Sequence, residues 1–138
     1  MRNGIPDGRL SVIPNHTSLG PAPHGPGHLV AFVGRIAPEK GIGDFLELAR
    51  RLPELPFVVA GSVKRGAEPL LDSLPRNVRM LGFLDQQAPD ALWRDTRVFV
   101  APSRWYEGFP NSVLVAMAFG RPVVTSDCGA MPEIVAHG

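Results

Sequence analysis

The sequence predicts an α/β domain built on a doubly wound, mostly parallel sheet of Rossmann type. Two observations support this fold class. Short, continuous apolar runs alternate along the chain with segments whose apolar residues recur at helical spacing. Because these runs lack an alternation with polar residues, they indicate strands that are buried on both faces of a sheet. The right-handed connections of such units wind helices onto both faces.

The elements follow one another in a regular order from residue 29. The first apolar run, 29–34, is a strand that ends at a glycine, and the helix expected at 43–52 has Asp44 in its first turn and Arg50 and Arg51 in its last, as the helix dipole favours. The other expected elements are a strand at 56–61, a weak helix at 66–73, a strand at 77–82, a short helix at 87–95, a strand at 97–103, a helix at 111–120, a strand at 121–127 and the start of a helix at 130–138.

The chain divides into a lead-in and one domain. Residues 1–28 are rich in Pro and Gly and read as an extended, loop-rich lead-in, with 10–14 as a candidate edge strand. Residues 29–138 form the Rossmann-like domain, and 138 residues are enough for a core of ordinary size. The sequence stops at Gly138, where a helix should be packing onto the sheet, so we expect a domain that is truncated at its C-terminal end.

Composition excludes several classes of function. The net charge of +1 gives no global field that would attract nucleic acid. The single Cys128 forbids an internal disulfide and agrees with a reducing compartment, and a cytoplasmic location is therefore predicted. Three histidines of the lead-in, His16, His24 and His28, fit no zinc-ligand spacing, so we expect no metal site and no cofactor.

The segment GRIAPEKG at 34–41 brings two cations to the carboxyl end of the first strand. Gly34 closes the strand, and Arg35 and Lys40 follow in the loop. Arginine can grip two phosphate oxygens at once and lysine supplies a point charge, so the pair suits a diphosphate. The alternative is that both are solvated loop charges, one of them paired with Glu39. The chain contains neither a G-x-G-x-x-G nor a G-x-x-x-x-G-K-[ST] motif, which argues against NAD-type and P-loop sites.

A second loop, WYEGFPN at 105–111, precedes a helix that has almost no polar face. Asn111 or Ser112 is expected to cap this helix, and the N–H groups at a helix start form an anion site. Gly108 allows a ligand to approach the backbone closely. Glu107 would repel a phosphate, but it can accept hydrogen bonds from sugar hydroxyls. Alternatively, Glu107 only interacts with the helix N-terminus, which is worth about 0.3–1 kcal/mol.

Other side chains have simpler interpretations. Trp93 lies at helical spacing and is expected in the core, whereas Trp105 and Tyr106 either line a sugar or acceptor cleft or pack their own loop. Lys64 and Arg65 belong to a solvated turn, with a phosphate neighbour as the alternative.

Several ordered segments resemble one family. The segments VIPN, VAFVGRIAPEKG, FVVAG, VRMLGFL and VFVAPSRWYEGFPNSVLVAMAFGRPVVTSDCGAMPEIV are similar to the C-terminal, nucleotide-sugar-binding domain of GT-B retaining glycosyltransferases of family 4, over about residues 10–138. The resemblance implies a UDP- or GDP-linked sugar as donor, a reaction that retains anomeric configuration without a metal, and an acceptor bound by an N-terminal domain. The isolated chain would then be inactive, and the full enzyme could associate peripherally with a membrane.

The resemblance also implies a role for each matching residue. Arg35 and Lys40 would neutralise the donor diphosphate, the backbone from Met80 to Leu84 would hold the nucleobase, and Glu107 with the backbone after it would hold the sugar and β-phosphate. The predicted catalytic residues are thus Arg35, Lys40 and Glu107. The predicted substrate-binding residues are Gly34, Met80, Phe83, Leu84, Gly108, Phe109, Pro110, Asn111 and Val115.

One position departs from the family pattern. A second Glu typically follows the first by eight residues and contacts the donor ribose, but Val115 stands there. It lies one turn after Asn111, so a Glu at this position could reach a ligand at the helix start. Its absence would weaken donor binding by about 1–3 kcal/mol. This departure supports the alternative of a degenerate, non-catalytic nucleotide-binding or protein-interaction module. Another Rossmann enzyme, such as an epimerase, fits the order of the loops less well.

Overall fold

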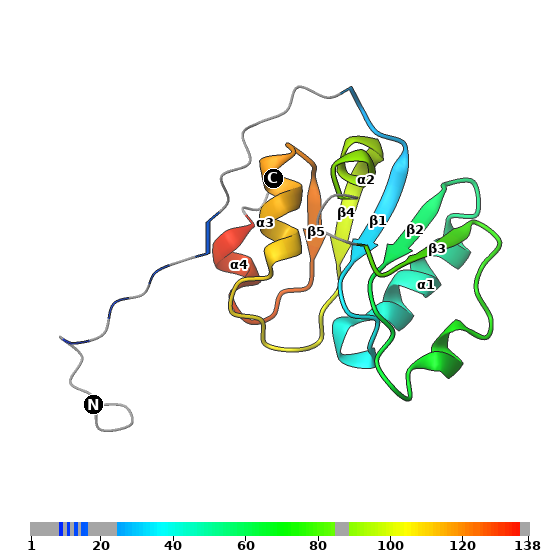
Figure 1. The fold of residues 1–138 in the computed structure, drawn as a ribbon, viewed down its shortest axis with the longest axis horizontal. Coiled ribbons are helices and arrows are strands. Elements are labelled where there is room, and N and C mark those ends of the chain that lie inside the picture. The colour runs from blue at the N-terminus through cyan, green and yellow to red at the C-terminus, as the bar shows by residue number, and fades with distance from the viewer. Residues whose placement is uncertain are drawn as a thin grey trace.

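A computed structural model describes residues 9, 11, 13, 15, 16, 25–84 and 89–135 of the chain. Its centre is a five-stranded, parallel sheet in the order β3-β2-β1-β4-β5 (Figure 1). This sheet confirms the predicted doubly wound α/β class. The strands are β1 (Leu29–Val33), β2 (Phe57–Ala60), β3 (Val78–Gly82), β4 (Thr96–Ala101) and β5 (Val123–Thr125).

Helices cover both faces of the sheet. On one face lie α1 and the 3-10 helix η3, and on the other lie α2, α3 and α4 (Figure 1). The bounds are α1 (Ile42–Arg51), α2 (Pro89–Asp95), α3 (Asn111–Ala118), α4 (Met131–Ile134), η2 (Pro38–Lys40) and η3 (Glu68–Leu71).

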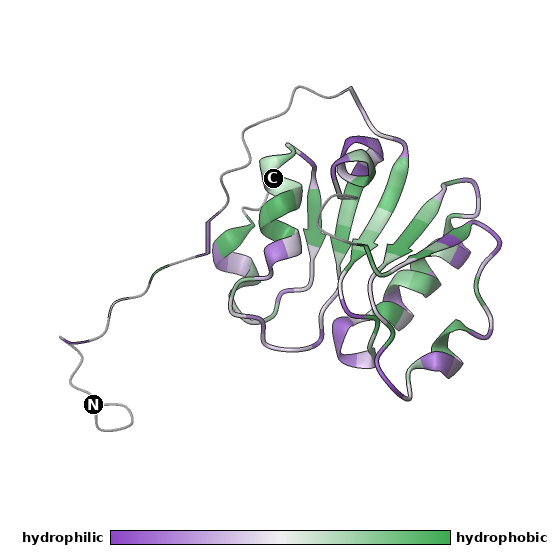
Figure 2. Cartoon of the chain, viewed as in Figure 1, coloured by the Kyte–Doolittle hydropathy of each residue, from purple (hydrophilic) through white to green (hydrophobic). Residues whose placement is uncertain are grey.

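Aromatic side chains fill the core on each face. Phe45 of α1 packs between Phe32 and Phe57, with ring centroids 5.6 and 5.4 Å apart. On the other face, Trp93 of α2 packs against Phe99, with the ring centroids 5.3 Å apart. Trp93 is buried, which confirms its predicted place in the core. The central strands β1 and β2 are apolar along their length (Figure 2), as strands that are covered on both faces must be. Strands β3 and β4 each include an exposed arginine, Arg79 and Arg97.

The strand order places a switch point between β1 and β4. From β1 the chain winds outward to β2 and β3, and it then returns to β4 on the other side of β1. The chain therefore leaves β1 and β4 toward opposite faces of the sheet, and the loops that follow these two strands meet at its carboxyl edge. Ligands of open α/β sheets bind in the crevice between such loops.

Two expected helices are shorter than predicted. In place of a helix at 66–73 the chain forms only the four-residue η3, because Pro69 removes a backbone donor. Of the last expected helix, at 130–138, the described part forms α4 at 131–134 with Val135 extended, and residues 136–138 lie outside the described residues. The expected edge strand at 10–14 and the start of the predicted 87–95 helix include residues outside the described part. None of the helices in the described ranges is long and apolar enough to span a membrane.

Candidate functional site

A cavity of about 70 Å³ lies at the switch point between the carboxyl ends of β1 and β4. Its lining includes Gly34, Arg35 and Lys40 from the loop after β1, and Ser103 and Glu107 from the loop after β4. The structure thus brings together Arg35, Lys40 and Glu107, which were predicted from two separate motifs, and adds Ser103.

Gly41 allows the two loops to touch. Its φ of 73° is left-handed, and a Cβ at this position would lie 1.7 Å from the carbonyl oxygen of Pro102. Only glycine fits such a position without displacing the backbone of the other loop. The amide N–H of Arg104 also donates to the carbonyl oxygen of Glu39 at 2.9 Å. The neighbouring Lys40 is therefore fixed against the loop that carries Glu107.

Glu107 is held by side chains from both loops. Its Oε1 accepts a charged hydrogen bond from Nζ of Lys40 and a second bond from Oγ of Ser103, at 3.1 Å. The side chain of Lys40 is 27% exposed and that of Glu107 is 15% exposed. The carbonyl oxygen of Glu107 accepts a bond from the amide of Ala130 at 3.0 Å. Both the backbone and the carboxylate of Glu107 are thus fixed, beside a cation that sequence analysis assigned to a diphosphate.

Arg35 is the more accessible of the two cations. Its side chain is 55% exposed and lies 3.6 Å from Oε1 of Glu39. Glu39 has a closer partner in Lys64, at 2.8 Å. The hydrogen bond from Lys64, with smaller contributions from the charges of Lys64 and Arg35, lowers the pKa of Glu39. Pairing with Glu39, the alternative raised from the sequence, therefore applies to Arg35 and not to Lys40.

The cap of α3 differs from the prediction. Neither Asn111 nor Ser112 caps the helix; Pro110 is the N-cap, and no side chain bonds the helix start. Pro110 is extended, with φ −67° and ψ 124°, so the helix begins at the next residue. Its carbonyl oxygen accepts from Val113 and Leu114. Within the described residues, the N–H groups of Asn111 and Ser112 have no acceptor, which leaves two donors for an anion.

Asn15 of the lead-in contacts this loop. Its Nδ2 donates to the carbonyl oxygen of Phe109 at 3.0 Å and to Oδ1 of Asn111 at 3.1 Å. The amide of Asn111 is therefore used between chain segments rather than at its own helix start. Gly108, the residue before Phe109, is exposed and has no heavy atom within 4 Å of where a Cβ would lie.

A second pocket, of about 200 Å³, adjoins the first at the ends of β1, β2 and β3. Both are lined by Val33, Gly34 and Arg35, and the second also contains Phe83 and Leu84. Phe83 is 77% exposed, and Leu84 packs partly against the core. The predicted nucleobase residues thus lie next to the predicted diphosphate residues.

Five of the predicted substrate-binding residues line neither cavity: Gly108, Phe109 and Asn111 lie around the start of α3, and Met80 and Val115 pack against the core. Met80 packs with the core on the α1 face and is not part of the pocket lining. Val115 is half-buried on α3 and packs against the core on the α2 and α3 face, and it lines neither cavity.

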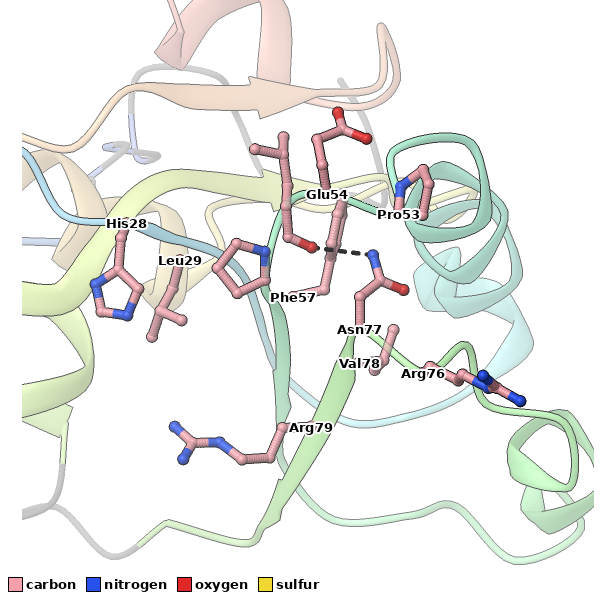
Figure 3. A pocket seen from close by; sticks show the side chains of 11 residues that line it. His28, Leu29, Pro53, Glu54, Phe57, Arg76, Asn77, Val78 and Arg79 are labelled. Atoms are coloured by element: carbon pink, nitrogen blue, oxygen red, sulfur yellow. Dashed lines mark hydrogen bonds between the residues drawn. The ribbon is translucent and has the colours of Figure 1, made fainter.

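A larger hollow of about 470 Å³ lies at the opposite, amino edge of the sheet. Figure 3 shows His28 and Arg79 on one side of it and Glu54 and Asn77 on the other. Nδ2 of Asn77 donates to the carbonyl oxygens of Ala49, Leu52 and Leu55, each at 3.0 Å, so this side chain closes the turn between α1 and β2.

Sequence analysis missed Ser103 and Asn15. Ser103 is 5% exposed, and its role depends on Glu107 lying within hydrogen-bond distance. The only signal in the sequence is its place between a strand end and the Glu107 loop. Trp105 and Tyr106 are 63% and 81% exposed, so neither packs into the core. Cys128 is a free, half-buried thiol, and the described residues contain no group of three or more ligands placed to hold a metal ion.

The model of the glycosyl transferases group 1 family matches residues 27–138, which contain the whole sheet and both cavities. The chain belongs to this family. It resembles the lipopolysaccharide core biosynthesis mannosyltransferase LpcC of Rhizobium leguminosarum bv. viciae, with 37% identity over 122 residues that cover 80% of this chain and 34% of the relative. It also resembles a glycogen synthase of Mycobacterium tuberculosis, with 32% identity over 100% of this chain and 34% of that protein.

A solved structure has the same fold. Anabaena HepE, crystallised with UDP and glucose, superposes with a TM-score of 0.71 at 25% identity, over 82% of this chain and 33% of that one. The chain therefore represents a GT-B glycosyltransferase domain and spans about a third of the length of these relatives.

Proposed function

We propose that this domain binds the nucleotide-diphosphate sugar donor of a retaining glycosyltransferase of family 4, a hexosyltransferase with a UDP- or GDP-linked donor. The observation that carries the proposal is the cluster at the switch point. Arg35, Lys40 and Glu107 line one cavity, and α3 begins nearby with two N–H groups that have no acceptor in the described ranges. Cations and backbone donors suit the diphosphate, and the carboxylate suits sugar hydroxyls. HepE, which shares this fold, binds UDP and glucose.

The site assigns a role to each end of the donor. Arg35, exposed at the boundary of the two pockets, would bind the diphosphate, and the N–H groups of α3 would bind its β-phosphate. Nζ of Lys40 has three protons, so it can contact a phosphate oxygen while it keeps Glu107. The pocket at Phe83 and Leu84 would take the base. Positive groups that stabilise the departing diphosphate would supply most of the catalysis, by an electrostatic mechanism.

The remaining parts of the proposal concern the whole enzyme. A second, N-terminal domain would bind the acceptor, and the cleft between the domains would enclose the reaction. The isolated chain would bind donor without turnover. We place the enzyme in the cytoplasm, in peripheral association with a membrane.

A degenerate module that binds weakly or serves protein interaction is the second candidate. The observation that favours it is Val115, whose side chain packs against the core where the family pattern has an acidic group.

Calorimetric titration with UDP, GDP and ADP, each free and sugar-linked, separates the two candidates. We expect millimolar or tighter binding of one nucleotide, and we expect Arg35→Ala and Lys40→Ala each to weaken it at least about tenfold, since each removes a charged hydrogen bond. Arg65→Ala is the matched control, because Arg65 is exposed and lines neither cavity. Absence of binding by every nucleotide would contradict the donor-binding role and favour the degenerate module.

A further inference from the structure

We infer that Ser103 is a positioning residue that orients the carboxylate of Glu107, so that its Oε2 is the atom presented to a sugar hydroxyl. The inference rests on the proposed function for its ligand. The contacts of Ser103 and Glu107 carry the inference.

Ser103 is a buried hydroxyl with more acceptors than protons. Its Oγ lies 3.1 Å from Oε1 of Glu107 and 3.4 Å from the carbonyl oxygens of Glu39 and Trp105. A hydroxyl can donate only one hydrogen bond, and a bond to a charged acceptor is stronger than one to a carbonyl. The shortest contact is also the charged one, so the proton of Ser103 goes to Glu107.

Glu107 consequently has one occupied oxygen and one open oxygen. Oε1 accepts from both Ser103 and Lys40, which uses the two lone pairs of that atom. None of the described residues donates to Oε2. Because Glu107 lines the cavity at the switch point, the acceptor left for a ligand is Oε2.

The bond from Ser103 to Glu107 does not involve the diphosphate, whereas Lys40 is shared with it. With donor bound, Nζ of Lys40 contacts a phosphate oxygen as well as Glu107, while the neutral hydroxyl of Ser103 gains little from a phosphate. Ser103 is itself fixed by two contacts: its carbonyl oxygen accepts from Oγ of Ser126, and its Oγ accepts from the amide of Trp105 at 3.3 Å. It is also buried, at 5% exposure. Ser103 therefore maintains the orientation of Glu107 while the donor is bound.

The test compares a nucleotide with its sugar-linked form in the 138-residue chain. In Ser103→Ala, we expect the affinity for UDP to stay within about twofold, while the extra affinity of UDP-glucose over UDP falls about tenfold, as loss of one charged hydrogen bond predicts. Ser103→Thr keeps the hydroxyl and should retain the extra affinity of UDP-glucose over UDP. Thr96→Ala is the matched control, because it removes another buried hydroxyl, bonded to the carbonyl oxygen of Leu92, from the opposite edge.

The outcomes are distinct. Equal weakening of UDP and UDP-glucose in Ser103→Ala would show that Ser103 only shapes the loop, and an unchanged extra affinity of UDP-glucose over UDP would likewise overturn the inference. If the unsubstituted chain bound no nucleotide, the proposed function would fail. The crystal structure of Ser103→Ala without ligand would then decide the inference alone. In Ser103→Ala we expect the carboxylate of Glu107 to rotate away from its present position, and in Ser103→Thr we expect it to stay. A carboxylate of Glu107 that does not move in Ser103→Ala would refute the positioning role.

Discussion

The two edges of the sheet offer a ligand different chemistry. The amino edge has the larger hollow, about 470 Å³ against about 70 and 200 Å³ at the carboxyl edge. Asn77, in its lining, already bonds carbonyl oxygens of the turn between α1 and β2, and the carbonyl oxygen of Asn77 accepts from the amide of Phe57. The charged side chains of the same lining, Glu54, Arg76 and Arg79, are exposed.

The carboxyl edge leaves groups open. Among the described residues, Oε2 of Glu107 and the N–H groups of Asn111 and Ser112 have no partner, and Arg35 is exposed beside them. What distinguishes the carboxyl edge is therefore not volume but open polar groups from two loops that converge at the switch point. Substitutions at both edges test this distinction.

The largest effect is expected where the two loops touch. Gly41→Ala places a Cβ against the carbonyl oxygen of Pro102 in a left-handed conformation, and we expect a loss of at least about 3 kcal/mol in unfolding free energy. Nucleotide affinity should fall as well, because Lys40 moves. Denaturant unfolding and titration measure both effects.

Gly43→Ala is the control for that change. No atom lies within 4 Å of a Cβ there, and Gly43 is inside α1. We expect the free energy of unfolding to rise by about 0.5–1 kcal/mol with unchanged binding. An unchanged free energy of unfolding in Gly41→Ala would contradict the close approach of the loops.

At the amino edge, Asn77→Ala should reduce stability without affecting nucleotide binding. The carbonyl oxygens of Ala49, Leu52 and Leu55 lose the side-chain amide that bonds them, and among the described residues only that of Leu52 keeps another donor, the amide of Leu55. We expect a cost of about 1–3 kcal/mol in unfolding free energy. The comparison is Asn15→Ala at the carboxyl edge, whose hydrogen bonds are exposed and whose loss should cost under about 0.5 kcal/mol. Weaker UDP binding in Asn77→Ala would show that the two edges are not independent.

Much of this architecture could be predicted from local sequence. The apolar runs indicated all five strands because burial on both faces removes polar residues from them. What failed were short segments with proline, at Pro69 and Pro110, where backbone geometry outweighed apolar spacing or capping preference.

The details of the site depended on contacts across the fold. Lys40 and Glu107 are 67 residues apart, and no pattern of residues indicated that they pair directly. The bond from Ser103 to Glu107 spans only four residues. It forms in a loop whose path follows from the close approach of Gly41 to Pro102, a contact between distant parts of the chain.

A smaller effect is expected from restoring the second acidic residue. Val115→Glu should strengthen binding of a nucleotide-diphosphate sugar about tenfold, by adding an acceptor for the ribose. Val115→Leu is the control, since it keeps the contact that this half-buried side chain makes with the core. Equal affinities of Val115→Glu and the unsubstituted chain would show that the side chain at this position does not reach the ligand.

The smallest effect concerns an exposed ion pair. The bond from Lys64 lowers the pKa of Glu39 from 4.5, so the pair stabilises the folded state above that pH and its contribution disappears as the pH falls below it. In Lys64→Met, an NMR titration of the carboxyl group should show the pKa of Glu39 rising toward 4.5. Arg65→Met should leave it unchanged, and the same pKa in both variants would contradict the pairing.

The most direct test of the account is to map where the nucleotide binds, by following backbone amide NMR signals during titration with UDP or the nucleotide that calorimetry selects. The account predicts that the largest changes fall at Gly34, Arg35 and residues 108–112, while residues 55–57 and 77–79 at the amino edge stay unchanged. Largest changes around Asn77 and Arg79, beside the larger hollow, would contradict it.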